Sequence, residues 1–151
     1  MRYIAFALLL GLSVGAAAAS DEHWIVIKSV DGAYGYDQGS VVDKGEGHFT
    51  FSSGLYTPKP VTAAGVTYSY MLTDSELSCS DGAYTTSAFY LFDDNAKMLD
   101  MKEGNGHWDS TGNNGVLDIL AGMICSHEPV KGAVEAGDME QAMKTMRGYF
   151  K

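Results

Sequence analysis

Two long runs of β-branched, aromatic and hydroxyl residues, 66–79 and 83–92, dominate the middle of the chain. Between them stands Ser80-Asp81-Gly82, and an Asp-Gly pair between two β-prone runs is the strongest local signal for a hairpin. The pattern therefore predicts two long antiparallel strands joined by a tight turn, with Cys79 at the end of the first strand.

Polar and apolar residues alternate along the first of these strands, but the alternation changes phase. Tyr70 and Leu72 share one parity, whereas Leu77 and Cys79 have the other. Because one extra residue reverses the facing of a strand, the change predicts a β-bulge near residues 73–75.

Shorter β-prone segments flank the hairpin and are separated by polar or glycine-bearing turns; they are 23–28, 33–37, 48–56 and 97–101. Pro58 and Pro60 each lack an N–H donor and fix φ, so we expect 57–65 to be a loop that crosses the sheet edge. About six strands in this order predict an antiparallel meander.

The apolar spacing becomes helical after Gly112. One stripe predicts a helix that ends at Cys125, and its members are Val116, Leu117, Leu120, Met123 and Ile124. Asn113 or Asn114 can cap its start. An antiparallel sheet backed by a helix on its inner face is an α+β fold.

Residues 127–151 form a tail whose second part, 135–150, permits a helix. Apolar residues recur in it at helical spacing: Met139, Met143, Met146 and Phe150. A helix that covers the end of the core or the sheet edge is the simplest interpretation. A methionine stripe also suits an adaptable binding surface, and a terminal segment can fray.

Residues 1–19 have the three features of a cleaved signal peptide: Arg2, the apolar run 4–14, and Ala17-Ala18-Ala19 before Ser20. No cysteine lies between residues 1 and 78, so we expect no lipid-anchored N-terminus. The predicted organisation is a signal peptide (1–19), one domain (20–126) and the tail (127–151). We expect the mature protein in the periplasm or secreted, without a stable membrane anchor.

Cys79 and Cys125 are the only cysteines. In an exported chain such a pair predicts one disulfide, whereas in the cytosol it would indicate two free thiols. The bond would join the end of the predicted helix to the end of a long strand, so the helix and the sheet would be linked covalently.

The formal net charge is −9, and Arg147 is the only arginine after residue 19. Binding to nucleic acid needs clustered lysine and arginine to neutralise phosphates, so this charge excludes it. Anionic lipid surfaces are disfavoured for the same reason. A cationic protein partner suits the charge, although solubility alone also explains it.

No motif for catalysis, metal binding or cofactor binding stands out, and we predict none of the three. The four histidines are scattered without metal-ligand spacing. The acidic segments 93–97 and 109–115 fail the calcium-loop pattern. An enzyme using His107 and Asp109 would need these side chains to converge in a cleft, whereas a solvated turn histidine is the simpler interpretation.

Tyrosine is the remaining distinctive residue type, with nine in the chain. Tyrosines are typical anchors of protein-recognition surfaces, and the candidate binding surface comprises Tyr34, Tyr36, Tyr56, Tyr68 and Tyr70. The alternative is structural, since tyrosines are good strand formers on half-buried faces.

The order of landmarks resembles the surface-adhesin protein E family of bacterial exported proteins. The resemblance covers 23–125 and rests on four features: Trp24-Ile25-Val26-Ile27, Gly35-Tyr36-Asp37, Leu77-Ser78-Cys79, and a helix that ends at Cys125. It implies an antiparallel sheet backed by a helix, a Cys79–Cys125 bond, and binding of proteins such as those of a host matrix.

The resulting hypothesis is a non-enzymatic exported binding protein with an unidentified protein partner. Because this chain lacks a lipidation cysteine, a soluble periplasmic role fits better than surface display. An alternative motivated by the negative charge and export is an inhibitor of a cationic hydrolase such as lysozyme.

Overall fold

The computed structural model describes residues 21–113 and 115–151. The predicted signal peptide (1–19) and the candidate capping residue Asn114 lie outside the described residues.

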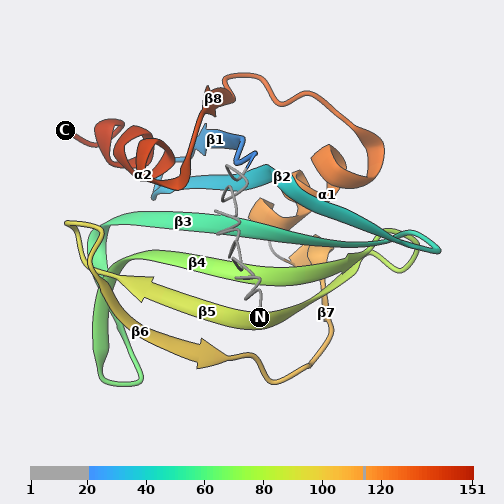
Figure 1. Ribbon diagram of the computed structural model, residues 1–151, viewed down its shortest axis with the longest axis horizontal. Helices are drawn as coiled ribbons and strands as arrows, with labels where there is room; N and C mark the ends of the chain where they lie inside the picture. Colours follow the sequence, from blue (N-terminus) through green and yellow to red (C-terminus); the bar gives the residue numbers. More distant parts are fainter. Residues whose placement is uncertain (1–20, 114) are drawn as a thin grey trace, which may run out of the picture.

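The fold is built on one antiparallel sheet, in which each strand from β1 to β6 lies beside the next one in the chain (Figure 1). These strands are β1 Trp24–Lys28, β2 Ala33–Gly45, β3 His48–Ala63, β4 Val66–Ser78, β5 Ala83–Phe92 and β6 Met98–Glu103. Two short strands extend it: β7 Asp109–Ser110 pairs with β5, and β8 Val134–Ala136 pairs with β1. The predicted antiparallel sheet and α+β class are confirmed, with eight strands in place of about six.

Two helices pack on opposite faces of this sheet. After the short 3-10 turn η1 (Thr111–Asn113), helix α1 (Gly115–Ser126) buries Leu120 and Ile124 against one face. Helix α2 (Met139–Gly148) buries Met143 and Met146 against the other. The methionine stripe of the tail therefore belongs to the core, and the single backing helix of the prediction is one of two.

A hollow in the sheet receives α2. Gly35 and Gly54 are cross-strand partners on β2 and β3, and neither carries a side chain to fill the space above them. A Cβ at Gly35 would lie 2.8 Å from Met146 Cε and 2.9 Å from the Ile25 carbonyl oxygen. A Cβ at Gly54 would lie 3.3 Å from the Trp24 ring. The two glycines let Met146, which is 1% exposed, approach the backbone of the sheet.

The hairpin has a bulge opposite the predicted position, but the bulge is on β5 and not on β4. Asp74 pairs with Ala88 and Ser75 pairs with Thr86, so the extra residue is Ser87 of β5. Strand β4 itself alternates regularly. Its Tyr70 and Leu77 therefore point to opposite faces, where each is buried under a different helix. A change of apolar parity needs no bulge where both faces of a sheet are covered.

The prediction of a loop at 57–65 is wrong, since β3 continues to Ala63. Its pairing with β2 ends at Tyr56, and its register with β4 shifts between Tyr56 and Val61. Pro58 and Pro60 therefore lie in an irregular stretch that has lost one neighbouring strand, where a missing N–H interrupts no regular ladder.

The Cys79–Cys125 disulfide is present, with the two Cα atoms 5.7 Å apart. It joins the C-terminal end of α1 to the residue that follows β4, as predicted. Within the described ranges, neither helix has the length and apolar character needed to span a bilayer.

Candidate functional site

The structure does not bring the five candidate tyrosines together on one surface. Tyr36, Tyr56 and Tyr70 are buried, at 5%, 5% and 2% exposure. Tyr36 packs on the α1 side of the sheet, whereas Tyr56 and Tyr70 pack on the α2 side. The other two, Tyr34 and Tyr68, are half-buried. Three of the five are therefore core residues and are not available to a partner.

Tyr56 and Tyr70 belong to the hydrophobic core under α2, and their hydroxyl groups make hydrogen bonds at its edge. Their ring centroids are 4.7 Å apart, and the Tyr70 hydroxyl donates to the Met143 carbonyl of α2 at 3.1 Å. Burial raises the pKa of Tyr70 to about 12. The Tyr56 hydroxyl donates to Asp94 at 3.3 Å, and Arg147 of α2 pairs with the same carboxylate. These tyrosines hold α2 on the sheet.

Tyr34 lines a groove of about 270 Å³ between α1 and the sheet. Apolar side chains form much of the wall: Leu55, Met71, Phe89 and Leu117. Tyr68 lies elsewhere, opposite Val61 on the β3–β4 hairpin. A role for Tyr34 or Tyr68 in binding stays a prediction.

His107 and Asp109 come close but not in a cleft. Their Nε2 and Oδ1 atoms are 3.7 Å apart, and the two side chains are 70% and 59% exposed. Both side chains are largely exposed, so the described residues do not enclose this pair in a cleft. Within 21–113 and 115–151, no three histidine, cysteine, aspartate or glutamate side chains are arranged to hold a metal ion.

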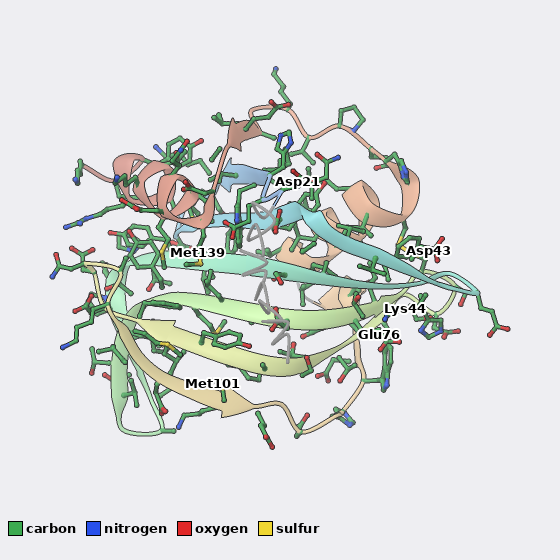
Figure 2. All side chains as sticks on the ribbon, in the orientation of Figure 1. Asp21, Asp43, Lys44, Glu76, Met101 and Met139 are labelled. Carbon is green, nitrogen blue, oxygen red and sulfur yellow. A yellow bond between two sulfur atoms is a disulfide. The ribbon has the colours of Figure 1, made fainter. Side chains whose placement is uncertain are left out.

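The face of the sheet that carries α2 divides into an apolar half and a polar half. The apolar half is the core under α2. In the polar half, cross-strand partners are Ser52 with Asp74 and Thr50 with Glu76, and Glu76 also pairs with Thr85 on β5. This half contains a groove of about 490 Å³, which we call the polar groove, lined chiefly by Lys44, Thr50, Ser52, Asp74, Glu76 and Thr85. Lys44 and Glu76 are labelled in Figure 2.

Hydroxyl groups hold the Asp74 carboxylate in the polar groove. Ser52 Oγ donates to Asp74 Oδ1 at 2.7 Å, and the Tyr90 hydroxyl donates to Oδ2 at 3.0 Å. The hydrogen bond to Asp74 is the main cause of the raised pKa of Tyr90. Both carboxylate oxygens are thus held in place by neighbouring strands, which fixes the position of the charge.

The second carboxylate adjoins an imidazole, which in turn contacts an exposed indole. His48 Nδ1 lies 3.0 Å from Glu76 Oε1, and the His48 ring meets the Trp108 ring edge-on with centroids 5.9 Å apart. Trp108 is 40% exposed. Two placed carboxylates and an exposed aromatic therefore lie next to one another on an open sheet face.

The sequence did not point to this site, because the candidate binding surface was based on tyrosines and not on hydroxyl and acidic residues of the strands. A usable signal was present: hydroxyl or acidic residues recur two apart in three successive strands, at Thr50/Ser52, Asp74/Glu76 and Thr85/Ser87. Alternate positions of one strand share a face, so Thr50/Ser52 and Asp74/Glu76 predict one polar patch once the strand register is known. In β5 the extra residue Ser87 interrupts the alternation, and the register places Thr85 opposite Glu76.

Comparison of the chain with protein-family models, with curated proteins and with solved structures gave no match.

Proposed function

We propose that this chain is a non-catalytic binding protein that holds a basic protein partner in the polar groove. The observation that carries the proposal is the pair Asp74 and Glu76 on an open sheet face, oriented by Ser52, Tyr90 and His48. Preoriented carboxylates lose little entropy when a lysine or arginine side chain binds them.

Two further features favour a protein as the partner. Trp108 is an exposed aromatic beside the groove, and tryptophan is enriched among the residues that dominate binding energy at protein interfaces. The chain has a net charge of −9, which accelerates encounter with a positively charged surface.

The proposal includes export and the adhesin-E type of binding protein. The features of residues 1–19 and the disulfide support an oxidising compartment, the periplasm or the medium. The resemblance to the surface-adhesin protein E family supports protein binding as the activity.

The test compares affinity for a panel of basic proteins, including lysozymes and matrix proteins, between the wild-type chain and Asp74→Asn/Glu76→Gln. Both substitutions keep the side-chain shape and remove two charges. We expect about a tenfold rise in Kd, equivalent to about 1.4 kcal/mol, because two placed ion pairs are lost. Biolayer interferometry at about 50 mM and about 150 mM salt measures it.

A matched control is Asp31→Asn/Asp118→Asn, which removes the same charge from exposed positions outside the groove. The control is expected to bind within about twofold of wild type. Equal losses in both variants would show that only the overall charge matters, and absence of binding to every basic protein would overturn the proposal.

A second candidate is inhibition of a cationic hydrolase such as lysozyme, favoured by the same groove because its carboxylates, Asp74 and Glu76, suit a basic side chain of the hydrolase. A lysis assay with increasing amounts of the chain tests it. Inhibition that disappears in Asp74→Asn/Glu76→Gln supports this candidate, and flat dose curves against a panel of lysozymes remove it.

A further inference from the structure

Strand β6 ends the sheet opposite to β8. It pairs with β5 on one side, and no other described strand borders it on the other. Exposed apolar side chains gather on this strand: Met98, Leu99 and Met101 are 50%, 41% and 51% exposed. Proteins blunt open edges with proline, bulges or short strands. Strand β6 has no proline, and its bulge at Leu99 leaves residues 100–103 in regular register with β5. Met101 is labelled in Figure 2.

The backbone of β6 has a defined outward set of hydrogen-bonding groups. The N–H of Gly104 donates to the Ser87 carbonyl of β5 at 2.8 Å. Backbone N–H and C=O groups alternate in direction from one residue of a strand to the next. The backbone groups of Lys102 and Asp100 therefore also point toward β5, whereas those of Met101 point away from it. Consistent with this, the N–H of Met101 donates to the side chain of Asp100 at 2.9 Å and not to β5.

Charges on β6 select one self-pairing register. In an antiparallel pair of β6 strands centred on Met101, the outward-pointing residues oppose each other, and Asp100 of each copy faces Lys102 of the other. Shifting the centre to Asp100 or to Lys102 would place like charges opposite each other, which is destabilising. Within one copy Asp100 and Lys102 are 2.8 Å apart, so both side chains already lie on the same face of the strand.

We propose that β6 pairs with β6 of a second copy of this chain, antiparallel and two-fold symmetric about Met101, so that one sheet runs through a dimer. The outward N–H of Met101 then exchanges the Asp100 side chain for the carbonyl of Met101 in the second copy, which releases Asp100 to pair with Lys102 of that copy. Two Asp100–Lys102 pairs form between copies, and the exposed methionines cover one another. This association uses the sheet edge and does not depend on the polar groove.

The test uses charge reversal with complementation in the full chain. Wild type is expected to have twice the monomer mass by light scattering at high concentration. Asp100→Lys alone and Lys102→Asp alone are each expected to be monomeric, because like charges then oppose each other in both pairs. An equimolar mixture of the two variants is expected to recover the dimer mass, because each lysine of one variant then faces an aspartate of the other.

The mixture separates contacts between copies from contacts within a copy. In each single variant the internal Asp100–Lys102 pair stays broken after mixing, so recovery of the dimer arises only from pairing across the edge. A monomeric wild type at all concentrations, or dimers that persist in both single variants, would overturn the proposal.

Cysteine trapping provides an independent readout of the register. Opposed residues on two antiparallel strands have Cα atoms about 5.5 Å apart, within the range of a disulfide. Oxidised Met101→Cys is therefore expected to form a covalent dimer. Leu99→Cys is the control, because in this register it lies away from the two-fold centre and does not oppose itself. Cross-linking of Leu99→Cys but not Met101→Cys would contradict the proposed register.

Discussion

At the scale of single residues, Tyr70 connects the sheet to α2 through both its ring and its hydroxyl. It is 2% exposed, its ring contacts Tyr56, and its hydroxyl donates to the Met143 carbonyl of α2. Burial disfavours the charged phenolate and raises the pKa of Tyr70 to about 12. The packing of α2 is therefore linked to the protonation of a buried phenol.

The raised pKa of Tyr70 predicts loss of stability in alkali. An ordinary tyrosine has a pKa of about 10, so the unfolded chain releases this proton at lower pH than the folded protein. The stabilising contribution is complete below about pH 10 and disappears as the pH rises towards about 12. Thermal unfolding of wild type and Tyr70→Phe between about pH 8 and about pH 12 measures the effect.

At neutral pH Tyr70→Phe is expected to lose about 1–2 kcal/mol of unfolding free energy, because the buried hydrogen bond from the Tyr70 hydroxyl to the Met143 carbonyl is lost. The difference between the two proteins is then expected to shrink with rising pH, since phenylalanine does not ionise. A difference that stays constant up to about pH 12 would contradict the assigned pKa.

At the scale of elements, the two helices are attached to the sheet in different ways. Helix α2 is held by side chains, including the Arg147–Asp94 pair and the methionines above Gly35 and Gly54. Helix α1 buries fewer residues, Leu120 and Ile124, and is joined to the sheet by Cys125. The disulfide therefore contributes more to the position of α1 than to that of α2.

Removal of the disulfide is expected to destabilise the protein by about 4 kcal/mol, because the bond closes a loop spanning 46 residues. The variant Cys79→Ser/Cys125→Ser avoids free thiols, and denaturant unfolding gives the free energy. Hydrogen exchange is expected to accelerate in α1 more than in α2. Equal acceleration in the two helices would show that the bond stabilises the whole domain and not α1 in particular.

At the scale of the whole molecule, the C-terminal residues complete the domain. Strand β8 borders β1, and α2 covers the sheet face that contains Trp24 and Tyr70. Without these elements the chain would expose large aromatic side chains that are 3% and 2% accessible in the complete structure. The segment 127–151 thus contributes a strand and a core layer.

Truncation after Ser126 is accordingly expected to abolish cooperative folding, because it removes Ala136, Ala142, Met143 and Met146 from one core cluster. Near-ultraviolet circular dichroism and thermal unfolding measure the loss. Deletion of Lys151 alone is the control and is expected to leave both signals unchanged, because that residue is exposed. A truncated chain that unfolds cooperatively would show that the first 126 residues form an independent unit.

Local patterns were sufficient for the hairpin, the α1 stripe and the choice of the disulfide partners. The hairpin follows from Asp81-Gly82 between two β-prone runs, and α1 from apolar residues at helical spacing. The burial of individual tyrosines could not be predicted from the local pattern. Tyr34 and Tyr36 lie on the same strand and face, but only Tyr36 is buried. Coverage by a helix that is distant in sequence makes that difference.

The amino-acid sequence by itself determined the strand-forming segments, both helices' apolar stripes and the negative charge, because these depend on residue type and short-range spacing. The tertiary structure decided which face each helix covers and that β3 continues through Pro58 and Pro60. It also decided that Asp74 meets hydroxyls, and Glu76 an imidazole, from neighbouring strands. Strand register and helix docking bring together residues far apart in the chain, and no local pattern encodes those distances.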